Sequence, residues 1–152
     1  MQGPRPFLIG GLWRHGEAVA PVNNPFTGQL LAEVSNASSS DAEAAIQSTI
    51  DAAAVMAALP SHARYQVLQK IAGGLYDRRE EFARLMTAEA GKPIADAKRE
   101  VSRAVQTFTI AAEEAKRIPG EVIPLDWTPG TDSHLGILRR VPIGPVLGIT
   151  PF

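Results

Sequence analysis

The stretch Val141-Pro142-Ile143-Gly144-Pro145-Val146-Leu147-Gly148-Ile149-Thr150-Pro151-Phe152 decides the predicted fold. Its apolar run from Val146 to Thr150, entered through two proline–glycine turns, predicts a buried strand. In open α/β sheets, ligands bind just beyond the carboxyl ends of the strands. We therefore expect this strand to lead toward a ligand site, and the residues before it to form the layers on which the strand rests.

Composition excludes several classes of partner. The 152 residues correspond to one domain, and 15 basic residues are interleaved with 16 acidic ones to give a net charge of −1. A basic stripe or patch, which nucleic-acid binding requires, is missing from this pattern. We therefore expect no nucleic-acid partner.

The sequence contains no cysteine. Disulfides, thiolate metal sites and a cysteine nucleophile are therefore excluded within these 152 residues. No window approaches 18 consecutive apolar residues, and the N-terminus lacks the pattern of a signal peptide. We expect a cytoplasmic protein with no membrane partner.

The N-terminal part predicts a cluster of three short strands. Phe7–Trp13 and Glu17–Ala20 flank Arg14-His15-Gly16, which indicates a hairpin. The turn residues of Asn23–Gly28 lead into a third strand over Gln29–Val34. Three short strands with so little apolar content must lie against other elements to be stable.

Four amphipathic helices in series are predicted for the middle of the chain. The first helix begins with a capping box of Ser40 and Glu43 and ends before Pro60. Its inward stripe is expected to be Ile46, Ile50, Ala53 and Ala57. The second begins at Ser61 and contains Gly73-Gly74, where we expect either fraying or a close neighbour. The third ends at Gly91 as a left-handed C-terminal residue, and the fourth begins at Pro93 and runs to about Ile118.

The last third predicts one exposed strand before the terminal one. Glu121–Thr131 is expected to be irregular, and Ser133–Val141 alternates as a half-exposed strand. Such a strand can pair with the sheet edge of another chain.

Three motifs in this order carry a family resemblance: Asn24-Pro25-Phe26-Thr27-Gly28, Glu89-Ala90-Gly91-Lys92-Pro93 and the Val141–Phe152 stretch. Together they resemble the N-terminal part of the NAD(P)-dependent aldehyde dehydrogenase superfamily, over Phe7–Phe152. The resemblance implies an α/β fold with an N-terminal strand cluster, a four-helix layer, an oligomerisation-type strand and the first strand of an incomplete Rossmann-like sheet. Residues 1–132 and 142–152 would be the N-terminal portion of the cofactor-binding domain, 133–141 the oligomerisation-type strand, and the catalytic domain would be absent.

The resemblance also implies a function for the complete enzyme. Members oxidise an aldehyde to a carboxylic acid through a cysteine thiohemiacetal, with NAD or NADP as hydride acceptor. Ile149, Thr150, Pro151 and Phe152 match the segment that lines the cofactor, whereas no catalytic residue can be carried over and no metal ligand is assigned. Val22-Asn23 and Glu89 match positions that bind a monovalent cation in some members. Ser133–Val141 would make the enzyme a homo-oligomer, and the chain alone, lacking the cysteine, is expected to be inactive.

Other interpretations stay open for the same residues. Ile149–Phe152 could be the end of a core strand, and the chain could be a non-catalytic interaction or pseudogene fragment that pairs with a full-length homologue. His15, His62 and His134 share no metal-ligand spacing, and Glu113-Glu114 near a helix end is typical of a solvated surface.

Overall fold

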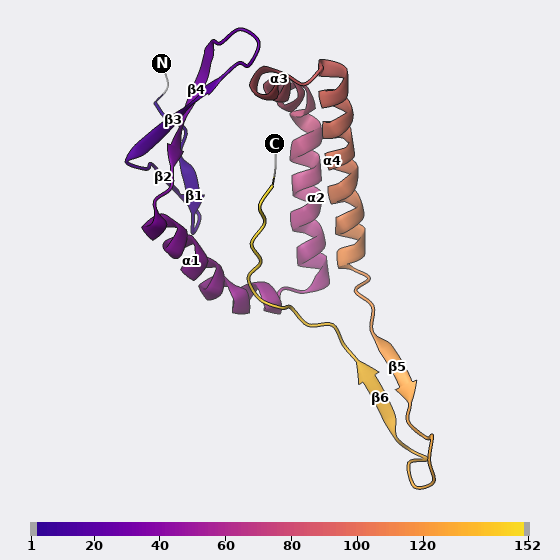
Figure 1. Ribbon diagram of the computed structural model, residues 1–152. Coiled ribbons are helices and arrows are strands. Elements are labelled where there is room, and N and C mark those ends of the chain that lie inside the picture. Colours follow the sequence, from indigo (N-terminus) through magenta and orange to yellow (C-terminus); the bar gives the residue numbers. More distant parts are fainter. Residues whose placement is uncertain (1–2, 151–152) are drawn as a thin grey trace.

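The structure, a computed structural model, describes residues 3–150 (Figure 1). In chain order its elements are β1 (Phe7–Ile9), β2 (Leu12–Arg14), β3 (Ala18–Asn23), β4 (Leu30–Asn36), α1 (Ser39–Ala58), α2 (Ser61–Asp77), α3 (Arg79–Ala90), α4 (Ile94–Ala115), β5 (Glu121–Pro124) and β6 (Leu135–Leu138). The strands form antiparallel pairs, β1 with β2, β3 with β4 and β5 with β6. The prediction of a mixed α and β chain is confirmed at this level.

The first hairpin differs from the prediction. β1 and β2 pair directly, and the turn between them is Gly10-Gly11, with φ of 59° and 81°. Two successive residues with positive φ make the tight turn that fits the twist of a hairpin, and glycine adopts this conformation without steric cost. The predicted turn at Arg14–Gly16 is therefore wrong, and β3 pairs with β4 instead.

The loop between β3 and β4 is held by Asn24. Its side-chain Oδ1 accepts hydrogen bonds from the backbone N–H groups of Phe26 at 2.9 Å and Thr27 at 3.1 Å. The backbone N–H of Gly28 donates to the carbonyl of Asn24 at 2.8 Å. The predicted turn at these residues is confirmed, because an asparagine side chain can replace the backbone acceptors of a turn.

The start of α1 lies two residues before the predicted capping box. Ser38 is the N-cap, and its Oγ accepts from the backbone N–H of Asp41 at 3.2 Å. The Asp41 carboxylate in turn accepts from the backbone N–H of Ser38 at 2.9 Å. The pair predicted from Ser40 and Glu43 is therefore wrong, since among three consecutive serines the first one meets a carboxylate at the third helical position.

The buried core lies where α3 meets α4. It consists of Ala83, Ala97 and Val101, with Phe82 and Met86 packed against it. α2 lies alongside α4 in Figure 1, and Ala72 and Ala112 are also buried. Three of these buried side chains belong to α4. The apolar residues of α4 therefore pack against both α2 and α3.

Two glycine predictions for the helices have opposite outcomes. Gly91 ends α3 with φ of 67°, and its N–H donates to the carbonyl of Thr87 at 3.1 Å, as predicted. α2 instead continues unbroken through Gly73-Gly74, and no neighbouring atom lies within 4 Å of an added Cβ there. Neither fraying nor a close neighbour is present, because the packing of the rest of α2 outweighs the cost of two glycines.

α1 stands apart from the other three helices. Figure 1 shows it following the strand cluster, with the terminal stretch of the chain running between it and α2. None of its residues is buried, and Ile46 and Ile50 of the predicted inward stripe are about half exposed, at 53% and 50%. The four predicted helices are all present, but only α2, α3 and α4 pack together among the described residues.

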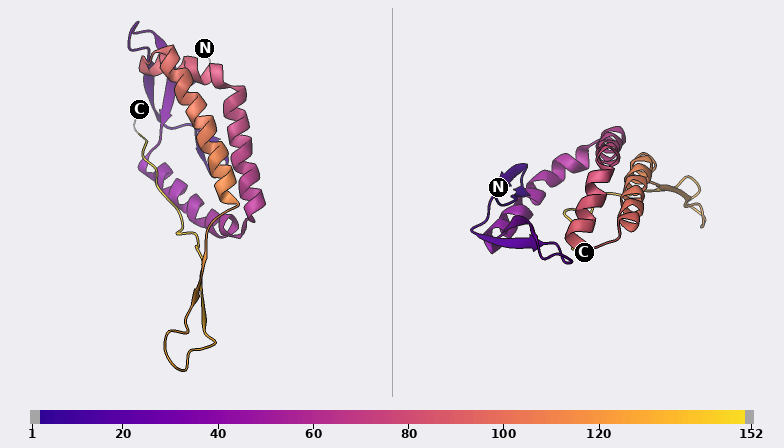
Figure 2. Two further views of the ribbon diagram at one scale, coloured as in Figure 1. Left: turned by 90° about the vertical axis from the view of Figure 1, so that its right-hand side faces the viewer. Right: turned by 90° about the horizontal axis from the view of Figure 1, so that it is seen from above.

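The β5–β6 hairpin projects away from the helices (Figures 1 and 2). Glu121 pairs with Leu138 and Pro124 with Leu135. The prediction of irregular structure over Glu121–Thr131 is therefore wrong at β5, and the strand predicted over Ser133–Val141 is reduced to Leu135–Leu138. Cross-strand pairing decides both outcomes, because β5 finds its partner in β6, and beyond Leu138 no backbone hydrogen bond within residues 3–150 continues the pairing.

The terminal stretch is extended but forms no strand. Residues 139–150 are outside any sheet, and no parallel sheet is present within residues 3–150. The predicted strand from Val146 to Thr150, and with it the first strand of a Rossmann-like sheet, is therefore wrong for this chain. A strand requires a hydrogen-bonded neighbour, and this stretch has none among the described residues. Within the same range, no helix has the length and apolarity needed to cross a membrane.

Candidate functional site

The predicted cofactor segment lies on the exposed terminal stretch. Ile149 is 86% exposed and Thr150 is also exposed, whereas Pro151 and Phe152 lie outside the described residues. No backbone hydrogen bond joins residues 141–150 to any other part of the 3–150 range. The stretch therefore presents unpaired backbone donors and acceptors together with apolar side chains.

A groove separates α1 from the beginning of this stretch. Its volume is about 770 Å³, within the usual size range of ligand sites. In Figure 1 the terminal stretch passes the end of α1 and then runs between α1 and α2. The groove is lined by Thr49, Ala52, Ala53, Met56, Ala57, Arg64, Ile118, Arg139, Arg140, Val141, Pro142, Gly144, Pro145 and Val146. Ile149 and Thr150 are not part of this lining.

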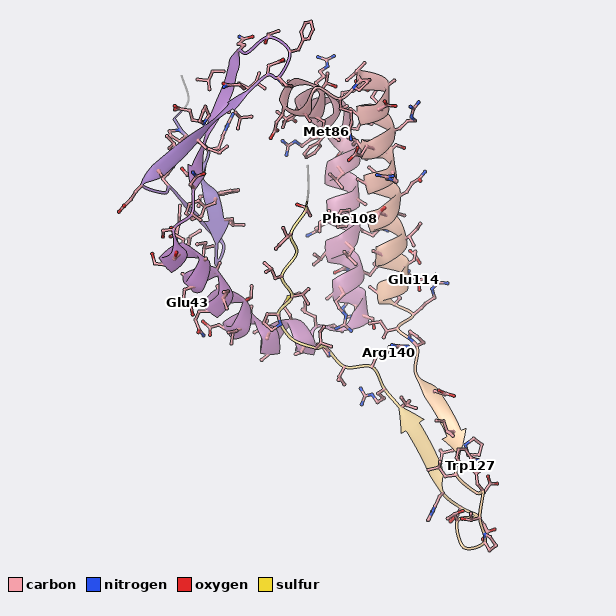
Figure 3. All side chains as sticks on the ribbon, in the orientation of Figure 1. Glu43, Met86, Phe108, Glu114, Trp127 and Arg140 are labelled. Atoms are coloured by element: carbon pink, nitrogen blue, oxygen red, sulfur yellow. The ribbon has the colours of Figure 1, made fainter. Side chains whose placement is uncertain are left out.

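Three arginines give the groove a positive character. Arg64 comes from the first turn of α2, and Arg139 and Arg140 follow β6. Figure 3 shows Arg140 at the base of the β5–β6 hairpin. No acidic residue lines the groove, and none of the three arginines forms an ion pair with another residue of the 3–150 range.

Arg64 has an unmet hydrogen-bonding need. Its Nε is buried and has no partner within the described part of the chain. A buried donor without an acceptor typically costs about 1–3 kcal/mol. The Arg64 guanidinium is therefore the polar group in the groove with the strongest demand for an added acceptor.

Arg64 was not predicted from the sequence, although the sequence contains a signal for it. Arg64, Leu68 and Ala72 recur at steps of four along α2, so that they share one helical face. Leu68 is half-buried and Ala72 is buried, which makes this the inner face of the helix. A charged residue on an otherwise apolar face indicates a buried polar role.

The first two sequence motifs meet in space. A Cβ added at Gly91 would lie 3.1 Å from Cγ of Pro25, so that the loop after β3 rests against the junction of α3 and α4. Lys92 at this junction is half-buried and pairs with Glu100 of α4. Its hydrogen bond lowers the pKa of Glu100. Lys92 is held at this junction because Glu100 lies within reach of its ammonium group.

Other candidate residues have structural rather than chemical surroundings. Glu113 pairs with Lys116 at 2.8 Å and Glu114 pairs with Arg117, so each carboxylate has a basic partner three residues further along the chain. The cation positions suggested at Val22-Asn23 and Glu89 stay a prediction. Within residues 3–150, no three His, Cys, Asp or Glu side chains gather in a way that could hold a metal ion.

Comparison with known proteins identifies the family. Residues 13–152 match the sequence model described as "Aldehyde dehydrogenase family". The chain belongs to the aldehyde dehydrogenase family. The family predicted from the three motifs is thereby confirmed.

Relatives of this aldehyde dehydrogenase-family chain match nearly its whole length. It is 40% identical over 144 residues to 3-sulfolactaldehyde dehydrogenase of Priestia megaterium, which covers 95% of the chain and 30% of the relative. It is 40% identical over 149 residues to a probable NADP-dependent succinate-semialdehyde dehydrogenase of Sinorhizobium fredii, covering 98% of the chain and 28% of the relative.

A solved structure supports the same assignment. Aldehyde dehydrogenase 21 of Physcomitrella patens, in complex with the reaction product succinate, superimposes with a TM-score of 0.85 at 37% identity. The match covers 90% of this chain and 29% of that structure. The chain therefore spans about 30% of the length of the relatives that it matches.

Proposed function

We propose that this chain supplies the N-terminal portion of the cofactor-binding domain of an enzyme that oxidises an aldehyde to a carboxylic acid with NAD or NADP. The observation that carries the proposal is the 40% identity over 95% of the chain to a named aldehyde dehydrogenase. Residues 1–132 and 142–152 would belong to this domain, with 133–141 as the oligomerisation-type strand.

In this proposal the chain binds cofactor but performs no covalent chemistry. Ile149, Thr150, Pro151 and Phe152 would line NAD(P), largely through their backbone groups. The nucleophilic cysteine that the family uses has no counterpart here, since the sequence contains no cysteine. In this proposal other polypeptide would supply it, and the 152 residues alone are expected to be inactive.

The substrate would be an aldehyde that carries an anionic group. Sulfolactaldehyde and succinate semialdehyde, which appear in the names of the two relatives above, each have an acidic group at a distance from the aldehyde. The enzyme would assemble as a homo-oligomer through the Ser133–Val141 segment. Support comes from β6, whose Leu135 and Ile137 side chains are 59% and 67% exposed.

A chimera tests the proposed function. Residues 1–152 would replace the matching segment of the Priestia megaterium enzyme, and NAD(P)H formation would be followed with 3-sulfolactaldehyde and succinate semialdehyde. We expect aldehyde-dependent NAD(P)H formation by the chimera and none by the 152-residue chain. Ile149→Pro, which removes a backbone N–H, should raise KM for the cofactor about threefold to tenfold, a change on the order of 0.7–1.4 kcal/mol. Ile149→Ala, which keeps the backbone groups, should change it less.

A folded chimera without activity would reject the proposed function. Activity of the 152-residue chain would reject the assignment of the nucleophile to other polypeptide. The exposed β6 favours a second candidate, a non-catalytic chain that pairs with a full-length homologue. Co-purification with an intact relative, without any gain of activity, would favour that second function.

A further inference from the structure

Arg64 and the unpaired stretch beside it point to a protein partner. The groove combines two unmet needs: the buried Nε of Arg64 lacks an acceptor, and the backbone of residues 141–146 lacks hydrogen-bond partners within the described range. A guanidinium pairs best with a carboxylate, which can accept two parallel hydrogen bonds. An extended backbone is best satisfied by another strand.

Both needs are met by one kind of occupant. We propose that the groove binds an extended polypeptide segment whose backbone pairs with residues 141–146 and whose aspartate or glutamate side chain accepts from Arg64. The segment would belong to the remainder of an aldehyde dehydrogenase chain, so this inference rests on the proposed function. Arg64 then acts as a docking residue that fixes the position of the terminal stretch.

The surroundings of the groove favour a polypeptide over a small anion. The lining around the three arginines is mostly apolar, and Ile143, Leu147 and Ile149 of the adjoining stretch are 91%, 84% and 86% exposed. A small anion would satisfy Arg64 but would leave these side chains and the backbone in water. An added strand would cover both the apolar side chains and the backbone, and the surplus of positive charge in the groove favours a strand that carries an acidic side chain.

Arg64 differs from the other two arginines of the groove. Arg139 and Arg140 are exposed, and both also line a smaller adjoining pocket that contains Glu121. Arg64 is half-buried, lines only the larger groove, and has no acidic residue beside it in that lining. The partner carboxylate is therefore assigned to Arg64, and removal of Arg139 or Arg140 is expected to weaken docking less.

The test uses the 152-residue chain and, as probe, the 70% of the Priestia megaterium enzyme that the chain does not match. The two polypeptides would be co-expressed, and their dissociation constant measured after purification. Arg64→Met should weaken binding at least tenfold, whereas Arg103→Met on the exposed part of α4 should change it less than twofold. Equal binding by the Arg64→Met and unaltered chains would overturn the proposal.

A second variant identifies the acidic partner. Arg64→Lys places a primary amine where the guanidinium stood, and a zero-length carbodiimide can couple this amine to an adjacent carboxylate. We expect peptide mapping to find residue 64 joined to one aspartate or glutamate of the probe. Cross-links confined to the 152 residues would overturn the proposal.

Two further outcomes assign the groove to other occupants and also overturn the proposal. Arg64-dependent binding of succinate by the chain, without binding of the probe, would indicate a small anion. Arg64-dependent self-association in sedimentation would indicate a second copy. Because binding is measured without turnover, an active chimera with failed docking rejects only this inference, and docking with an inactive chimera rejects only the proposed function.

Discussion

The packed helices α2, α3 and α4 differ sharply from residues 139–150. In the helical part, Ala83, Ala97 and Val101 are buried, and several charged side chains form ion pairs, as Glu80 and Lys98 do at 3.0 Å. In residues 141–150, every described side chain is exposed, and the backbone has no partner in the 3–150 range. The helical region has a buried apolar core, whereas the terminal stretch has neither buried side chains nor backbone hydrogen bonds within the described range. Four pairs of substitutions can break or sharpen this contrast.

The largest effect is expected from placing a charge in each region. Val101→Asp buries a carboxylate in the core and should lower the free energy of unfolding by about 3 kcal/mol or more. Val146→Asp, at a side chain that is 75% exposed, should change it by about 0.5 kcal/mol or less. Urea unfolding followed by circular dichroism measures both. Similar losses for the two variants would remove the contrast.

Glycine substitutions should have opposite signs. Gly91→Ala forces a side chain into a left-handed conformation and toward Pro25, and should cost about 1–2 kcal/mol. Gly73→Ala enters open space within α2 and should stabilise the helix by about 0.5–1 kcal/mol. Urea unfolding measures the change in stability for both variants. A loss of stability for Gly73→Ala would show that a neighbouring group approaches Gly73.

The N-cap of α1 should contribute less. Ser38→Ala should cost about 1 kcal/mol, whereas Ser40→Ala should cost little, which separates the observed cap from the predicted one. Hydrogen bonds from Ser38 lower the pKa of Asp41 below its ordinary 3.8. The stability that this carboxylate adds is therefore present above 3.8 and lost as the pH falls through the lower folded value. An NMR titration in which Ser38→Ala leaves the Asp41 pKa unmoved would contradict the cap.

The smallest effect is expected at the helix surface. The hydrogen bond from Lys98 lowers the pKa of Glu80, so Lys98→Met should return it toward 4.5 with little change in unfolding. The contribution of Glu80 is present above 4.5 and fades as the pH falls through its folded value. The salt dependence of the Glu80 titration should weaken in the variant but not vanish, because Arg84 and Arg79 also lower its pKa, and Arg99→Met on the same helix provides the control.

Sequence reasoning succeeded at two local features, although two others, the cap of α1 and the turn of the first hairpin, were placed wrongly. The Asn24 turn and the left-handed Gly91 depend on residues within a few positions, so both are confirmed. It failed where a distant partner decides the outcome. The strand from Val146 to Thr150 needs neighbours that the described chain does not contain, and β5 was missed because its partner lies in β6. The buried role of Arg64 could have been predicted, because it is a charged residue on the inner face of α2.

The two tryptophans give this chain a natural pair of optical reporters. Trp127 lies toward the far end of the projecting β5–β6 hairpin (Figure 3), and Trp13 lies in β2 of the strand cluster. Both side chains are mostly exposed, at 75% and 69%. Substituting either one with phenylalanine would leave a single fluorophore that reads one region. A blue shift of Trp127 emission on adding a partner, with Trp13 unchanged, would register the covering of the hairpin in real time.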